Sequence, residues 1–223
     1  MKQNIIAILP AYNQEKNMAQ IIEQVKKHVS QIIVVADGSI DKTAEVAAES
    51  GAIVPEHTLK RGKGNAVIRG IETSKSLNPD IIVLMDSDGQ HNSEEIPKLL
   101  KPIIENEADM VLGSRLLGIL KTSNINKIGN HLLNSLHFLL TFKWVTDAES
   151  GFRVFKAKKL YELNLIAPRY EIESDTLLEA IDKKLRIKEV PISIVKEEKG
   201  ITLLDGLKIG KFIIAKRIKL FLK

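Results

Sequence analysis

Short apolar runs alternate with longer stretches of helical periodicity through the first half of this chain. The apolar runs predict strands at 5–9, 31–35, 52–54, 81–85 and 110–112. The stretches between them predict helices at about 17–28, 41–50 and 63–77. Strands joined by a helix run parallel through right-handed crossovers, and the helices then cover both faces of the sheet. The sequence therefore predicts an α/β fold with a mostly parallel central sheet flanked by helices.

The second half of the chain is less regular. Its patterns predict helices at about 126–140 and 172–184, and strands at about 151–155 and 187–194. The sequence contains no internal repeat, low-complexity tract or linker-like stretch. With 223 residues, it can bury a core without covalent staples, and we expect one large domain.

Composition excludes several classes of protein. There are no cysteines, which excludes disulfides and thiolate metal sites and fits a reducing cytosol. No run reaches the roughly 18 to 20 apolar residues of a membrane span, and the first strand is not preceded by a signal peptide pattern. We therefore expect a cytoplasmic protein that is not integral to a membrane.

Positive charge is concentrated at the C-terminus. The residues after Asp205 include six cations and no acid, so removing those cations takes the formal net charge from +5 to about −1. A nucleic-acid-binding surface spreads its cations more widely, so we expect no nucleic-acid partner. Lysines and apolar residues fall on largely opposite sides of a helix at 205–223. Such a helix can lie on an anionic membrane; packing against its own domain or a second subunit is the alternative.

Two carboxylates, those of Asp86 and Asp88, directly follow the apolar run at 81–84. Like charges held side by side are costly unless they share a cation, and a divalent metal that binds a diphosphate would supply one. A helix cap and a solvated turn acid are the alternative interpretation. Polar clusters also follow the first two predicted strands, at 10–15 and 36–41. The carboxyl ends of parallel strands share one edge, where nucleotides bind, so this coincidence favours a metal and nucleotide site.

These segments, in order, resemble family 2 glycosyltransferases, which are inverting enzymes with the GT-A nucleotide-sugar fold. The resemblance lies in Pro-Ala-Tyr-Asn-Gln-Glu at 10–15, Val-Val-Ala-Asp-Gly-Ser-Ile-Asp at 34–41, Arg-Gly-Lys-Gly-Asn-Ala at 61–66, Asp-Ser-Asp-Gly-Gln-His at 86–91 and Gly-Ser-Arg at 113–115. Segments 146–153, 170–180 and 189–192 resemble the dolichyl-phosphate mannose synthase-like branch. Members of that branch commonly move a sugar from a nucleotide diphosphate to a polyprenyl phosphate.

The resemblance implies a donor site with Mg²⁺ or Mn²⁺ at Asp86 and Asp88. The metal would stabilise charge on the departing diphosphate, which makes Asp88 a candidate catalytic residue. Asp37 would accept a hydrogen bond from the base, and Lys63 would approach phosphate from a glycine-flanked turn, unless that turn is only a solvated basic loop. The implied donor-binding residues are Pro10, Ala11, Tyr12, Asn13, Glu15, Asp37, Gly38, Lys63, Asp86, Ser87, Asp88 and Gln90.

The acceptor site is predicted from basic residues of the second half. Arg115 and Arg153 are candidates for the acceptor phosphate, because a guanidinium binds phosphate through two parallel hydrogen bonds. An internal ion pair of Arg153 with Asp147 or Glu149 is the alternative. If the acceptor is a sugar hydroxyl, Asp147 would be the catalytic base. If it is a lipid phosphate, no base is needed, and Asp147 would orient the catalytic candidate Arg153 or the acceptor.

Two departures from the family pattern affect these expectations. Ala36 stands where the family usually has the first of two adjacent aspartates, so the resemblance implies one base or ribose contact fewer than in the family. The segment 195–202 replaces an arginine and a Gly-Ser-Lys loop that can close over the phosphates. Lys196 or Lys199 would substitute there as a point charge, without the fork geometry of arginine. Lys196 is accordingly a third candidate for the acceptor phosphate.

The expected activity is inverting transfer of a hexose from a GDP-mannose or UDP-glucose type donor to polyprenyl or dolichyl phosphate at the cytoplasmic membrane face. The first alternative is transfer to a sugar hydroxyl of a glycan or lipid-linked saccharide. The second is a non-catalytic nucleotide-sugar-binding module. We expect a catalytic domain at 1–204, with a nucleotide-sugar half at 1–115 and an acceptor half at 116–204, followed by the basic helix at 205–223. The sequence predicts no particular oligomeric state.

Overall fold

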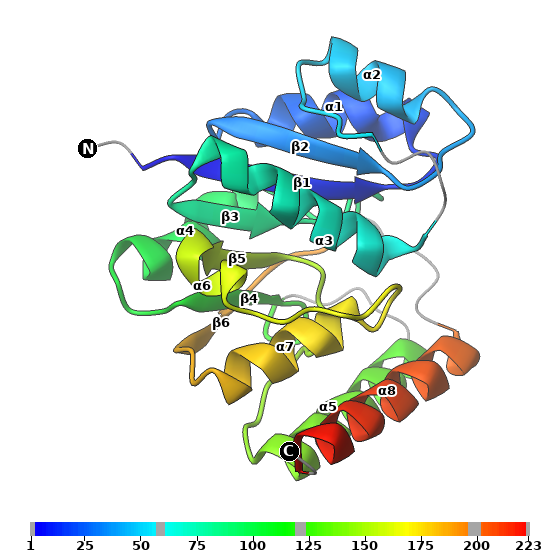
Figure 1. Cartoon of the computed structure of the whole chain (residues 1–223), viewed down its shortest axis with the longest axis vertical. Coiled ribbons are helices and arrows are strands. Elements are labelled where there is room, and N and C mark those ends of the chain that lie inside the picture. The colour runs from blue at the N-terminus through cyan, green and yellow to red at the C-terminus, as the bar shows by residue number, and fades with distance from the viewer. Residues whose placement is uncertain (1–2, 57–60, 119–123, 196–201, 222–223) are drawn as a thin grey trace.

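The structure is a computed structural model that describes residues 3–56, 61–118, 124–195 and 202–221 (Figure 1). Its centre is a six-stranded sheet in the order β2-β1-β3-β5-β4-β6. The strands are β1 (Ile5–Ala11), β2 (Gln31–Ala36), β3 (Ile81–Leu84), β4 (Met110–Ser114), β5 (Arg153–Lys156) and β6 (Ile187–Pro191). All neighbours pair in parallel except β5, which is antiparallel to both β3 and β4. The expected α/β class is confirmed.

Helices cover both faces of this sheet (Figure 1). They are α1 (Glu15–Val25), α2 (Thr43–Glu49), α3 (Lys63–Ser74), α4 (Ile96–Ile104), α5 (Asn124–Thr141), α6 (Ala157–Tyr161), α7 (Ile172–Asp182) and α8 (Leu203–Phe221), with short 3-10 helices η1 (Lys75–Leu77) and η2 (Ser93–Glu95). Successive strand side chains point to opposite faces, so Ile6 and Ile8 of β1 join the core beneath α3, while Ala7 and Leu9 join the core beneath α1 and α4. Both faces are apolar because both are covered.

The structure differs from the sequence expectations at three places. The predicted strand at 52–54 makes only an isolated parallel bridge between Ile53 and Ile33. The antiparallel direction of β5 was not expected, because local periodicity reports that a segment is extended and not which way it runs. Helices α4 and α6 were also not among the expected elements.

The C-terminal helix α8 packs lengthwise against α5 and beside α7 (Figure 1). Ile209 and Ile213 are fully buried in that contact. Lys216 also points inward and forms ion pairs with Asp175 and with Glu179 of α7, the latter at 2.7 Å. The helix therefore packs on its own domain, and Lys216 does not belong to an exposed lysine face.

The remaining described lysines of α8 face solvent. Lys208, Lys211 and Lys219 are exposed, together with the apolar side chains of Leu207, Ile214 and Ile218. In the described part of the chain, none of the helices combines the length and apolar character that crossing a bilayer requires. An exposed mixture of lysine and apolar side chains therefore remains on this helix.

Replacing Lys216 tests how firmly α8 is held. Lys216→Met leaves the fully buried Asp175 without its charge partner, so we expect a loss of about 3 to 5 kcal/mol in the free energy of unfolding. Lys219→Met removes an exposed lysine of the same helix and should change this free energy by less than about 0.5 kcal/mol. Urea denaturation measures both. Equal stabilities for the two variants would contradict the packing described here.

Candidate functional site

The loops that follow β1, β2 and β3 meet at one edge of the sheet. The backbone N–H of Asp37 donates to the carbonyl of Ala11 at 2.7 Å, which joins the first two loops. The hydroxyl of Ser87 donates to the carbonyl of Pro10 at 2.6 Å, which joins the first and third. The three polar clusters expected to share an edge do so, although β3 is the third strand along the chain and not the fourth.

Asn13 and Glu15 hold the first loop to the second. The amide oxygen of Asn13 accepts the N–H of Ile40 at 3.0 Å, and the carboxylate of Glu15 accepts the N–H of Lys42 at 3.0 Å. Asn13 has a φ of 53°, a left-handed conformation that asparagine tolerates better than most residues. Both side chains, expected to bind the donor, thus hold the loops after β1 and β2 together through backbone contacts. Tyr12, between β1 and Asn13, is partly exposed at this edge.

Asp37 anchors the turn that carries Lys63. Its buried carboxylate accepts the backbone N–H of Arg61 at 2.8 Å and of Gly62 at 2.9 Å. Gly62 has a φ of 102°, and a Cβ there would lie 2.6 Å from the carbonyl oxygen of Pro168. Only glycine fits this position, because the turn here lies directly against the segment before α7. The neighbouring Gly38 also has a positive φ, of 61°.

Lys63, the first residue of α3, places its ammonium between two carboxylates. Its Nζ lies 2.7 Å from Asp86 Oδ1 and 2.8 Å from Glu173 Oε1. Burial disfavours the charged ammonium, but Asp86 and Glu173 outweigh that effect and raise the pKa of Lys63. The Gly-Lys-Gly turn is therefore not a solvated basic loop, because its lysine belongs to a largely buried ion-pair network.

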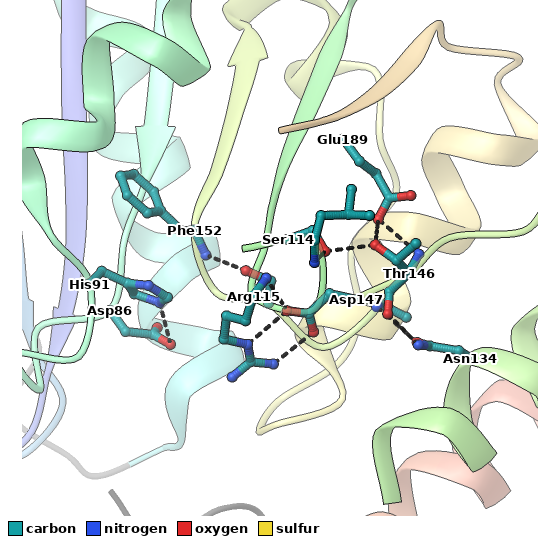
Figure 2. A network of polar contacts seen from close by, with 12 residues as sticks. Asp86, His91, Ser114, Arg115, Asn134, Thr146, Asp147, Phe152 and Glu189 are labelled. Carbon is teal, nitrogen blue, oxygen red and sulfur yellow. Dashed lines mark hydrogen bonds and ion pairs between the residues drawn. The ribbon is translucent and has the colours of Figure 1, made fainter. Parts of the chain in front are cut away.

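Asp86 is tightly confined on its other side (Figure 2). Its Oδ2 lies 3.9 Å from Nε2 of His91, whose ring is 5.1 Å from that of Phe152. A Cβ on Gly151 would lie 2.1 Å from the same Oδ2, so the loop before β5 lies directly against this carboxylate. Burial alone would raise the pKa of Asp86, but the attraction of Lys63 and His91 lowers it overall.

Asp88 is the less neutralised member of the acid pair. Its Oδ1 accepts the backbone N–H of Gln90 at 2.9 Å, within the turn that follows β3. Burial and repulsion from Asp86 together raise the pKa of Asp88. An added cation between the two carboxylates would relieve that repulsion.

The carboxylate oxygens of Asp86 and Asp88 suit Mg²⁺ or Mn²⁺ that is shared with a phosphate ligand. Within the described ranges, no cluster of three or more acidic, histidine or cysteine side chains is arranged to hold a metal ion by itself. Magnesium is commonly bound by one or two carboxylates together with substrate phosphates and water. Asp86 and Asp88 provide such a pair of carboxylates at one edge of the sheet, and repulsion from Asp86 contributes to the raised pKa of Asp88.

Arg115 and Asp147 form a second charged pair beside the acid pair (Figure 2). The guanidinium of Arg115 donates through Nε and Nη2 to the two carboxylate oxygens of Asp147, at 2.7 and 2.8 Å. The backbone N–H of Arg115 also donates to Asp147 Oδ2 at 2.9 Å. Burial opposes the charge on Arg115, but Asp147 outweighs it and raises the pKa of Arg115. Asp147 thus orients Arg115 and not Arg153.

The segment around Asp147 is fastened from three sides (Figure 2). Glu189 of β6 accepts both the N–H and the hydroxyl of Thr146, at 2.8 and 2.6 Å. The hydroxyl of Thr146 lies 2.6 Å from that of Ser114 in β4. Asn134 of α5 donates to the carbonyl of Thr146 and accepts the N–H of Ala148. These contacts fix the position and orientation of Asp147 and hence those of Arg115.

Arg153 occupies a different place from the one expected of a phosphate ligand. It is only 2 % exposed, and its guanidinium donates to the backbone carbonyls of Ser150, Ala148 and Glu173 at 2.5 to 2.8 Å. No ion pair with Asp147 or Glu149 is formed among the described residues. The expectation fails because a sequence shows the charge of an arginine and not its burial. Lys196, the third acceptor candidate, lies outside the described residues.

Glu173 and Gly151 are the site residues that sequence reasoning did not assign. Glu173 matched the family only as part of a helix start, and an acid in the first turn of a helix has an ordinary role beside the helix dipole. Gly151 lies in the family-like segment 146–153, but the sequence does not show why that position requires glycine. Nothing local to either residue indicates that both contact the group around Asp86, because those contacts join segments far apart in the chain.

Comparisons with known proteins bear on the family and the fold of this chain. A model of the family described as Glycosyl transferase family 2 matches residues 6–163. The UDP-N-acetylglucosamine–dolichyl-phosphate N-acetylglucosaminyltransferase of Methanococcus voltae is 34% identical, covering 92% of this chain and 92% of the relative. The polyprenol monophosphomannose synthase of Mycolicibacterium smegmatis is 28% identical, covering 92% of this chain and 82% of the relative.

A solved structure shares the fold. Glucosyl-3-phosphoglycerate synthase from Mycobacterium tuberculosis, in complex with Mn²⁺, uridine diphosphate and glucosyl-3-phosphoglycerate, aligns with a TM-score of 0.74 and 25% identity. The alignment covers 97% of this chain and 79% of that chain. That protein therefore binds Mn²⁺ and a nucleoside diphosphate on a fold like this one.

Gly151→Ala tests whether the confinement of Asp86 matters for binding. The added methyl group would overlap the Asp86 carboxylate and displace it, so binding of Mn²⁺ with a nucleoside diphosphate should weaken about tenfold or more. Gly206→Ala is the control, since a Cβ at Gly206 in α8 meets nothing within 4 Å. Calorimetric titration measures the binding, and circular dichroism checks the fold. Unchanged binding in Gly151→Ala would show that Asp86 is not a ligand.

Proposed function

This chain belongs to glycosyl transferase family 2, and on that premise we propose that it transfers a hexose from a nucleotide diphosphate sugar to polyprenyl phosphate, with inversion. The observation that carries the proposal is the acid pair Asp86 and Asp88 at the carboxyl edge of the sheet, beside the Arg115–Asp147 pair. In this proposal the acid pair binds the diphosphate of the donor through a metal ion, and Arg115 supplies a positive charge for the acceptor anion. The similarity to transferases named for dolichyl phosphate and polyprenol supports this acceptor class.

The donor half of the reaction requires stabilisation of the leaving diphosphate. A divalent Mg²⁺ or Mn²⁺ bound by Asp86 and Asp88 supplies a Lewis acid for this charge. Lys63 lies at hydrogen-bonding distance from Asp86 and adds a fixed positive charge next to the same place. Asp37, which holds the turn before Lys63, positions that charge. The pocket walls would come from the loops after β1 and β2.

The acceptor half depends on Arg115. Asp147 accepts hydrogen bonds from Nε and Nη2 of its guanidinium. Among the described residues Nη1 has no hydrogen-bond partner, so in this proposal it donates to an acceptor phosphate oxygen. A phosphate monoester is already an anion at neutral pH, so it can attack the sugar without a general base. Asp147 is poorly placed to be one, because its side chain is fully buried and both its oxygens accept hydrogen bonds from Arg115. This arrangement favours lipid phosphate over a sugar hydroxyl as the acceptor.

A lipid acceptor requires contact with a membrane, and we place that contact at the α5–α8 face, on the cytoplasmic side. Exposed apolar side chains gather on these neighbouring helices and just after α5: Leu132, Phe138, Leu139, Phe142, Trp144, Leu204, Leu207, Ile214 and Ile218. The exposed lysines Lys208, Lys211 and Lys219 lie on α8 together with four of these apolar side chains. Each cation near an anionic surface contributes about 1 kcal/mol to binding. In this proposal α8 is part of the catalytic domain and its outer face is the peripheral anchor.

A donor-by-acceptor screen tests the activity. The protein is incubated with Mn²⁺, labelled GDP-mannose, UDP-glucose or UDP-N-acetylglucosamine, and polyprenyl phosphate in vesicles with or without anionic phospholipid. We expect labelled lipid with one of these donors, loss of product on chelation, and faster transfer in anionic vesicles. Label in a soluble glycan and none in lipid would refute the lipid acceptor. Donor and Mn²⁺ binding without transfer to any acceptor would indicate a binding module.

Asp147→Asn separates the two acceptor chemistries. If Asp147 only holds Arg115, the variant should raise the KM for polyprenyl phosphate about tenfold while kcat and the KM for the donor change little. If Asp147 is a base, kcat should fall by a factor of about 100 or more at saturating acceptor. Steady-state kinetics with each substrate varied in turn distinguishes these results. A collapse of kcat alone would contradict the assignment made here.

A further inference from the structure

We infer that Glu173 is a positioning residue of the donor site: it shares the ammonium of Lys63 with Asp86, and so keeps Asp86 available to a divalent cation. This inference rests on the proposed function, because it concerns the metal that the acid pair would hold. It assigns a role to Glu173, which comes from α7 in the other half of the chain. The three residues Asp86, Lys63 and Glu173 are called the lysine bridge below.

The geometry of the lysine bridge is that of one ammonium divided between two carboxylates. The two Nζ to oxygen distances, 2.7 Å to Asp86 and 2.8 Å to Glu173, are nearly equal, so neither acid holds Lys63 alone. Without the charge of Glu173, the attraction of Lys63 would fall on Asp86 only. A fully paired Asp86 is a poorer ligand, because an incoming cation then competes with the ammonium for the same carboxylate.

The net charge of Asp86, Asp88, Glu173 and Lys63 matches, with opposite sign, the charge of one divalent ion. Asp86, Asp88 and Glu173 contribute three negative charges when ionised, and Lys63 returns one positive charge, which leaves two negative charges uncompensated by this group. Burial raises the pKa of Glu173, Lys63 opposes that rise, and Asp86 adds to it by repulsion. The carboxylates therefore repel one another even with Lys63 in place, and a divalent cation would restore balance.

The third N–H group of the Lys63 ammonium is available to a diphosphate bound at the acid pair. An ammonium carries three donors, and Asp86 and Glu173 accept two of them. The Lys63 side chain remains 20 % exposed, so the third donor can reach a diphosphate oxygen bound at the acid pair. Glu173 thereby fixes the direction in which Lys63 presents its charge to the donor.

Glu173 is itself held in place by a buried contact. Its backbone carbonyl accepts Nη1 of Arg153 at 2.6 Å, and Arg153 also binds the loop that lies against Asp86. Arg153 therefore links the start of α7 to the loop that lies against Asp86. This gives the carboxylate of Glu173 the fixed position that a positioning residue requires.

Mn²⁺ binding measured by electron paramagnetic resonance, without nucleotide, tests the inference. Glu173→Gln keeps the shape of the side chain but removes one charge and frees Lys63 to pair with Asp86, so the Kd for Mn²⁺ should rise about tenfold. Glu179→Gln is the matched control. Glu179 lies on the same helix, is equally exposed at 7 %, and forms its own lysine pair with Lys216, away from the acid pair. It should leave the Kd unchanged.

Lys63→Met supplies an independent readout with the opposite sign. Removing the ammonium should lower the Kd for Mn²⁺ alone, and at saturating Mn²⁺ it should weaken binding of uridine or guanosine diphosphate about tenfold. The inference is overturned if Glu173→Gln binds Mn²⁺ like Glu179→Gln, or if Lys63→Met does not bind Mn²⁺ more tightly. Should Glu173→Gln fail to fold, Lys63→Met decides alone. A wild-type chain that binds Mn²⁺ as described but transfers no sugar would sink the proposed function and not this inference.

Discussion

The buried guanidinium of Arg153 holds together the parts of this protein on which its site depends. A charge removed from water is costly unless its donors are satisfied, and here three backbone carbonyls satisfy them. Those carbonyls belong to the loop before β5 and to the start of α7. Since the loop carries Gly151 against Asp86, and α7 carries Glu173 against Lys63, one side chain sets both walls of the acid pair.

The two halves of the chain are consequently joined around Asp86 and Lys63 and not merely adjacent. A Cβ at Gly64 would lie 2.0 Å from the carbonyl oxygen of Ala167, so the start of α3 packs directly on the segment before α7. Asp175 of α7 accepts the backbone N–H of Ala167 and pairs with Lys216 of α8. A continuous set of contacts thus runs from the C-terminal helix to the turn that presents Lys63. The segments on either side of residue 115 are thus packed against each other.

Much of this fold follows from local pattern. The apolar runs place β1, β2, β3 and β4 correctly because a strand covered on both faces must be apolar throughout. The short runs also place Asp37 and Asp86 at strand ends, which is why the polar clusters could be expected at one edge. Arg153 and Lys216 were misjudged for a common reason. Both are buried cations held partly by α7, Arg153 through the backbone carbonyl of Glu173 and Lys216 through the carboxylate of Asp175, and local pattern does not report burial.

By itself the sequence determined the α/β class, the edge that carries the polar loops and the family to which the chain belongs, because each depends on residue order within short segments. Only the tertiary structure decided that β5 runs antiparallel, that Arg115 and not Arg153 is paired with Asp147, and that Glu173 shares Lys63 with Asp86. The physical reason is distance along the chain. Ion pairs and buried hydrogen bonds form between segments that only the folded sheet brings together, and their partners cannot be read from either segment alone.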